Sequence, residues 1–157
     1  MFILSYNLNM SFLEVSILMM ATINLVFAGI VFFQSKRDKV SIFYALIAFF
    51  ASLWSFATLF FFESKIAFLG HYIAGNLAYL SFFWFSVFYP QKITKSLALP
   101  IVVTVVDFLV LFLVPTPVFL SGGYAVFVIY LSFVFVLTEV FMFQKYRLCE
   151  DIERIRL

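Results

Sequence analysis

FLEVSILMMATINLVFAGIVFF, at residues 12–33, is an apolar run of 22 residues with one charged side chain, Glu14. An α-helix rises about 1.5 Å per residue, so about 20 apolar residues cross the roughly 30 Å hydrocarbon core of a bilayer. The basic stretch QSKRDK follows directly at residues 34–39. This pattern predicts a membrane-spanning helix that ends at a charged loop.

Four more runs of similar length and composition follow the first one. In all, the sequence predicts five spans, at residues 12–33, 41–62, 66–89, 96–114 and 123–143. None of them alternates in polarity as a membrane β-strand does. Hydrophobic residues make up 66% of the 157 residues and charged residues 11%, far below the roughly 25% charged residues of a soluble domain. We therefore predict an all-α integral membrane protein, a bundle of five transmembrane helices.

The basic residues outside these spans fall on one side of the predicted membrane. The loops at 34–40 and 90–95 and the tail at 144–157 carry nine of the ten Lys and Arg, and Lys65 is the tenth. An excess of positive charge marks the cytoplasmic side. The sequence thus predicts a plasma-membrane protein with an external N-terminal segment at 1–11. The C-terminal tail at 144–157 is expected in the cytoplasm, as an amphipathic helix or the start of a linker.

Polar side chains inside the predicted spans are the candidate functional residues, because burying a charge in the membrane costs roughly 2.5–3.5 kcal/mol. Asp107 lies too deep in the fourth span for its short side chain to reach water, so a buried partner is expected. The candidate cluster, which would bind a ligand or hold the bundle together, comprises Asp107, His71, Asn76, Asn24 and Glu139. Glu14 is expected to cap the first turn of its helix or to reach water.

A row of small residues marks one face of the third span. Its members are Ala67, Gly70, Ala74, Ala78 and Ser81. Residues three or four apart share a helix face, and small side chains let another backbone approach closely. We expect this face to pack within the bundle, and a sliding or dimer surface is the alternative. Trp54, deep in the second span, is expected to need a partner for its indole N–H.

Residue content argues against several activities. All ten Lys and Arg lie outside the five spans, which leaves no buried lysine for a retinal Schiff base. One histidine cannot supply the paired ligands of a membrane haem or the His cluster of a di-iron enzyme. No phosphate-binding loop or nucleophile triad is evident. We therefore predict no catalytic residue, no metal and no cofactor, and the charge of +2 reflects topology rather than nucleic-acid binding.

Several short landmarks follow one another in order along the chain. They are Gln34-Ser35-Lys36-Arg37-Asp38-Lys39, Phe43, Trp54, Phe88-Tyr89-Pro90, Gly122-Gly123-Tyr124 and Lys145-Tyr146-Arg147. In this order they resemble the first five helices of the N-terminal seven-helix membrane sensor region of bacterial and archaeal histidine kinases. The resemblance implies sensing of a small molecule or of the membrane state. It also implies two further helices and a cytoplasmic output module, and it carries over no ligand-binding residue.

These features predict a membrane-embedded sensory or receptor-like input domain for signal transduction, without catalytic activity of its own. Its expected partners are the lipid bilayer, an unidentified small-molecule ligand, and either a second copy of the chain in a homodimer or a cytoplasmic signalling module. The alternative is a small accessory or scaffold subunit of a larger membrane complex. A third interpretation is a transporter or channel component with Asp107, Glu139 and His71 as an ion relay.

Overall fold

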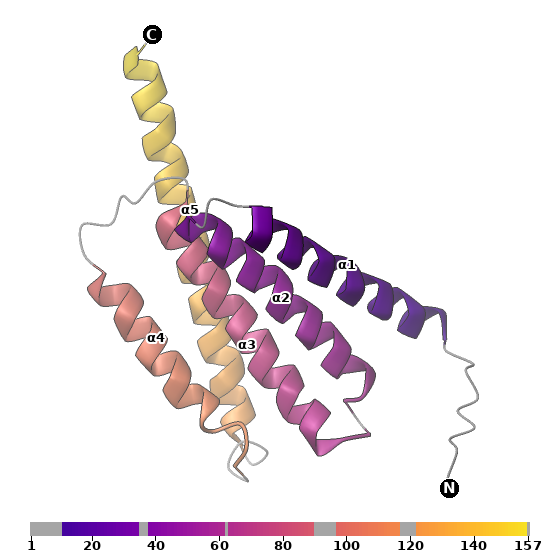
Figure 1. Cartoon of the computed structure of the whole chain (residues 1–157). Coiled ribbons are helices and arrows are strands. Elements are labelled where there is room, and N and C mark those ends of the chain that lie inside the picture. The colour runs from indigo at the N-terminus through magenta and orange to yellow at the C-terminus, as the bar shows by residue number, and fades with distance from the viewer. Residues whose placement is uncertain (1–10, 35–37, 62, 90–96, 117–121, 157) are drawn as a thin grey trace, which may run out of the picture.

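The computed structural model describes residues 11–34, 38–61, 63–89, 97–116 and 122–156. This part of the chain contains five helices and no strand, which confirms the predicted all-helical class. The helices are α1 (Phe12–Gln34), α2 (Lys39–Leu59), α3 (Lys65–Phe88), α4 (Ala98–Leu111) and α5 (Tyr124–Arg156), shown in Figure 1. All except α4 are long and apolar enough to cross a membrane. The predicted segment 1–10 and the loop at 90–95 lie outside the described residues.

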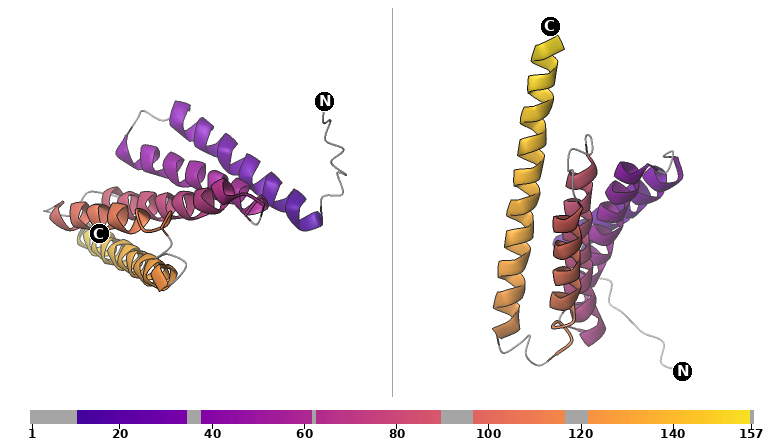
Figure 2. Two further views of the ribbon diagram at one scale, coloured as in Figure 1. Left: turned by 90° about the horizontal axis from the view of Figure 1, so that it is seen from below. Right: turned by 90° about the vertical axis from the view of Figure 1, so that its left-hand side faces the viewer.

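Helix α3 is the centre of the arrangement. It packs against α2, α4 and α5, while α1 packs against α2. Figure 2 shows α1 and α2 on one side of α3 and α5 on the other. The apolar core lies where α3, α4 and α5 meet, around Phe83, Val87, Val103 and Val134. Helices α1 and α2 therefore contribute little to this core.

Large apolar side chains cover much of the outer surface. Phe12 and Phe33 of α1 are 89% and 84% exposed, and Ile66 at the start of α3 is 83% exposed. A soluble protein rarely presents so large an apolar surface to water. The surface and the four long apolar helices fit a multi-pass membrane protein.

The first three helices each begin at a side chain that caps free backbone N–H groups. The Glu14 backbone N–H donates to Ser11 Oγ at 3.3 Å, and the Glu14 carboxylate accepts from the Ser11 backbone N–H at 2.6 Å. This reciprocal pair is a capping box, so Glu14 caps the first turn of α1. Asp38 accepts from the Ser41 backbone N–H at 2.8 Å, and hydrogen bonds from the Ser41 side chain and backbone lower the pKa of Asp38. Ser64 caps α3 in the same way.

Helix α4 is shorter than the predicted span at 96–114. It ends at Leu111 after 14 residues, which corresponds to a length of about 21 Å. Pro115 explains this end, because it has no N–H for the Leu111 carbonyl and its ring would clash with that carbonyl. The chain continues to Thr116 in tighter turns, with the Val114 N–H donating to the Leu111 carbonyl at 3.2 Å. The proline therefore limits the α-helical part of this segment to the 14 residues of α4.

Helix α5 is longer than the predicted span at 123–143. It runs without a break for 33 residues, or about 50 Å. The expected boundary between the fifth span and the tail at 144–157 is therefore not a break in the helix. Figure 1 shows the C-terminal part of α5 projecting beyond the ends of the other helices.

Lys145 joins α5 to the end of α3. From the sequence it is expected in the solvated tail, whereas in the structure it is only 2% exposed. Its ammonium group donates to the carbonyl oxygens of Ser86 at 2.6 Å, Val87 at 2.5 Å and Tyr89 at 3.1 Å. The last carbonyls of a helix lack partners within the helix, and positive charge is favourable there. We call this contact the Lys145 clasp.

Removing the Lys145 side chain should destabilise the bundle. Lys145→Ala removes hydrogen bonds from a charged donor, so we expect a loss of at least about 1.5–3 kcal/mol in the free energy of unfolding. Arg147→Ala is the matched control, because Arg147 is exposed on the same helix. Its loss removes only a contact with the Phe143 ring at 4.7 Å and should cost no more than about 1 kcal/mol. Denaturant unfolding of the purified proteins in detergent micelles measures both. Equal stability of the two variants would show that the clasp contributes nothing.

Candidate functional site

Asn76 of α3 and Asp107 of α4 form a buried hydrogen-bonded pair. Asn76 Nδ2 donates to Asp107 Oδ2 at 2.7 Å. Asn76 is fully buried and Asp107 is 1% exposed. The buried partner that the sequence demands for Asp107 is thus an amide from the central helix.

Tyr130 of α5 brings a third helix to this pair. Its hydroxyl donates to the Val103 carbonyl at 3.0 Å, and Val103 lies one turn before Asp107 on α4. The Tyr130 hydroxyl therefore reaches α4 one turn from Asp107, on the same face of that helix. We define the Asp107 cluster as Asn76, Asp107, Tyr130 and the Val103 carbonyl. It joins α3, α4 and α5 at one level of the bundle.

The Asp107 cluster has unused hydrogen-bonding capacity. Within the described part of the chain, no Lys, Arg or His forms an ion pair with the Asp107 carboxyl. Asn76 Oδ1 is buried and has no hydrogen-bond partner. A buried acceptor without a partner costs about 1–3 kcal/mol. Chemically, the cluster offers an acidic group and an open acceptor, which together can hold a proton or a small hydrogen-bond donor.

His71 belongs to a separate polar group between α3 and α2. Trp54 Nε1 donates to His71 Nε2 at 3.1 Å, and His71 Nδ1 lies 3.0 Å from Thr58 Oγ1. The Thr58 hydroxyl in turn donates to the Trp54 carbonyl at 2.8 Å. Since Nε2 accepts a hydrogen bond, the imidazole is neutral with its hydrogen on Nδ1. The indole N–H of Trp54 thus has the partner that the sequence requires, and His71 is not a neighbour of Asp107.

The other two candidate residues also lie away from the Asp107 cluster. Asn24 is on α1, which packs against α2. Glu139 is exposed on α5, about two and a half turns beyond Tyr130. The fold therefore brings together two of the five polar residues singled out from the sequence. In the described residues, no group of three His, Cys, Asp or Glu side chains could hold a metal.

The row of small residues on α3 faces α2 over part of its length. Ala67, Gly70 and Ala74 line an apolar groove between the two helices. A Cβ atom on Gly70 would lie 3.7 Å from the Ala57 Cβ atom of α2. Gly75 lies outside the predicted row, but a Cβ atom there would lie 3.5 Å from the Trp54 indole. Ala78 is half-buried and Ser81 is buried further along α3.

Sequence reasoning missed Tyr130 as a member of the cluster. It is one of eight tyrosines and lies in a long apolar run, where it reads as part of an aromatic surface. The available signal is chemical, because a buried tyrosine hydroxyl usually has a hydrogen-bond partner. That signal predicts that the Tyr130 hydroxyl has a partner, but it does not identify the residue that provides it.

A double-mutant cycle should detect the Asn76–Asp107 bond. Hydrogen bonds between membrane helices average about 0.6 kcal/mol and reach about 1.7 kcal/mol, so we expect a coupling energy of about 1 kcal/mol for a bond this short. The cycle compares Asn76→Ala, Asp107→Ala and the double variant by unfolding in micelles. Asn76→Ala combined with Ser52→Ala is the control, and its effects should add within about 0.5 kcal/mol. Additivity in the first cycle as well would argue against the bond.

Comparison of the chain with models of protein families, with curated proteins and with solved structures gives no match. The resemblance to sensor regions of histidine kinases therefore stays a prediction from the sequence.

Proposed function

We propose that the chain is a multi-pass protein of the plasma membrane and works as a sensory or receptor-like input domain, without catalytic activity of its own. The observation that carries this proposal is the continuity of α5. One helix contributes Tyr130 to the Asp107 cluster, forms the Lys145 clasp, and then projects past the other helices. A rigid helix of this kind can transmit a change at the buried cluster to a partner at its far end.

The proposed topology places the N-terminus outside the cell and the C-terminus in the cytoplasm. It is supported by the nine basic residues on one side of the spans and by the apolar outer surface. With a hydrocarbon core of about 30 Å, about 20 Å of α5 would extend beyond it. In sequence, this extension carries both acidic and basic residues, which suit a hydrated contact with a cytoplasmic signalling partner or a second copy of the chain.

Signalling requires two states of the bundle with different affinities for the stimulus. In the proposal, one state is the arrangement described above, with Tyr130 bonded to the Val103 carbonyl. A stimulus that moves this bond to another acceptor shifts α5 relative to α4, while the Lys145 clasp still holds α5 to α3. The resulting movement is a tilt of α5 about the clasp.

Cysteine labelling of intact cells tests the topology. In a Cys149→Ser background, an impermeant maleimide should label Ser64→Cys from outside, because that residue lies in a predicted external loop. Lys36→Cys, in a predicted cytoplasmic loop, should be labelled only after the cells are opened. Labelling of Lys36→Cys in sealed cells would invert the orientation and remove the tail from the cytoplasm.

Spin labels test whether the Asp107 cluster controls α5. Arg147 of α5 and Tyr44 of α2 are both exposed, so each can be replaced by a labelled cysteine in the Cys149→Ser background. Tyr130→Phe removes the bond to Val103 and should shift the mean distance between the labels in bilayers. Ser52→Ala is the control, because it removes a bond to the Ala21 carbonyl of α1 at 2.7 Å and should leave the distance unchanged. An unchanged distance in Tyr130→Phe would contradict transmission through α5.

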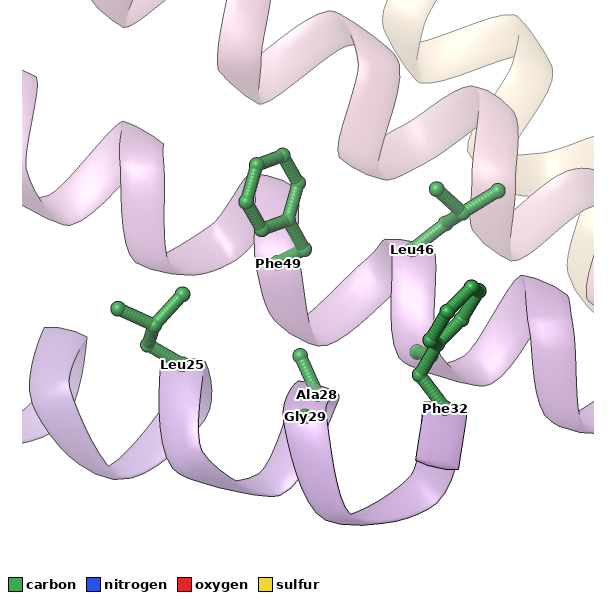
Figure 3. Close-up of a pocket in the computed structure, with 7 residues that line it drawn as sticks. Leu25, Ala28, Gly29, Phe32, Leu46 and Phe49 are labelled. Carbon is green, nitrogen blue, oxygen red and sulfur yellow. The ribbon is translucent and has the colours of Figure 1, made fainter. Parts of the chain in front are cut away.

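A second candidate function is an accessory or scaffold subunit of a larger membrane complex. It is favoured by an apolar groove of about 300 Å³ between α1 and α2. Figure 3 shows the residues that line it, among them Leu25, Ala28 and Phe32 of α1 and Leu46 and Phe49 of α2. Such a groove can accept a side-chain ridge from a helix of another subunit. Blue-native electrophoresis of native membranes separates the two candidates, since a hetero-complex of fixed stoichiometry favours the subunit and a homodimer favours the sensor.

A further inference from the structure

We propose that the Asp107 cluster is a proton-binding site, that the proton is the stimulus of this domain, and that proton release moves the hydrogen bond of Tyr130. The part of this inference that concerns the stimulus rests on the proposed sensory function. The proton site itself rests on the geometry of the cluster.

Among the described residues, the Asp107 carboxyl group has no counter-ion. Asp107 is 1% exposed. The groups that face it are the neutral amide of Asn76 from α3 and the Tyr130 hydroxyl from α5, which bonds to the Val103 carbonyl one turn away. Tyr130 is the one titratable side chain that faces it among the described residues, and no charged side chain does. A buried carboxylate without a counter-ion is unfavourable in an apolar medium, so the neutral acid is the favoured form here.

The hydrogen bonds around Asp107 also favour the neutral acid. The Tyr130 hydroxyl has one hydrogen, and it is used in the bond to the Val103 carbonyl. An amide hydrogen of Asn76 occupies Asp107 Oδ2. Among the described residues, the Asn76 amide is thus the one hydrogen-bond donor to the Asp107 carboxyl group. A buried carboxylate that accepts a single hydrogen bond is poorly compensated, so the neutral acid is favoured.

Proton release changes the partners of Tyr130. The carboxylic acid and a water molecule give a carboxylate and a hydronium ion, and no other bond changes. Both carboxylate oxygens then accept hydrogen bonds, and a charged acceptor attracts the Tyr130 O–H more strongly than a backbone carbonyl does. The Tyr130 O–H turns from Val103 to Asp107, while the Val103 carbonyl keeps its bond within α4. The buried acceptor Asn76 Oδ1, which has no partner, can accept a hydrogen bond from the water that carries the proton away.

Infrared spectroscopy of the full chain in lipid bilayers tests the proton site. We expect a carboxylic acid C=O band that is present at low pH, disappears as the pH is raised, and is missing from Asp107→Asn. Glu139→Gln is the matched control, because Glu139 is an exposed acid, and it should retain the band. Absence of an Asp107-dependent band at every pH would overturn the proposal. Loss of the band on addition of Na⁺ at constant pH would also overturn it, because the cluster would then be a metal-cation site.

The spin-label distance between Arg147→Cys and Tyr44→Cys, followed over the same pH range, tests the link to α5. It should change with the same midpoint as the carboxylic acid band, and Tyr130→Phe should keep the band but lose the distance change. In the protein with Tyr130 unchanged, the carboxylic acid band could titrate while the distance between the spin labels stays constant. This result would overturn the proton as stimulus and the proposed sensory coupling, but it would leave the proton site in place. A distance change without an Asp107 band would overturn the proton site and leave the coupling intact.

Discussion

The hydrogen bond between Asn76 and Asp107 is the interaction on which the placement of α4 against α3 depends. In an apolar surrounding, helices gain little from burying apolar side chains against one another, because lipid is as apolar as the side chains themselves. A carboxyl group in the middle of α4 can be accommodated only where a partner meets it. Asn76 provides that partner on α3, and α4 is thereby aligned with the central helix.

Helix α3 contacts neighbouring helices on several faces because consecutive residues on a helix point in different directions. Gly75 allows the Trp54 indole of α2 to approach closely, whereas Asn76 points to Asp107 of α4. The carbonyls at the end of the same helix bind Lys145 of α5. Small residues thus permit contact with α2, while polar atoms define the contacts with α4 and α5.

The two attachment points of α5 lie at Tyr130 and Lys145, about 22 Å apart along the helix. One attachment is a single neutral hydrogen bond to α4. The other is a charged group that donates to two carbonyls of α3 and to that of Tyr89, the residue that follows α3. Neutral hydrogen bonds are weaker than charge-assisted ones, so the bond at Tyr130 is the one that a stimulus can break first. This difference in strength is the physical basis for the proposed tilt of α5.

The helical class, the approximate position of each helix and the need of Trp54 and Asp107 for partners follow from the amino-acid sequence alone, whereas the sequence leaves Glu14 either to cap its helix or to reach water. These properties depend on contiguous apolar length, on residues a few positions apart, or on the cost of burying one group. Only the tertiary structure decided that His71 meets Trp54, that Asn76 meets Asp107, and that Lys145 is buried. Those contacts depend on the rotation and order of the helices, as shown by Lys145 and Ser86, which are 59 residues apart in the chain, and no local pattern encodes such a pairing.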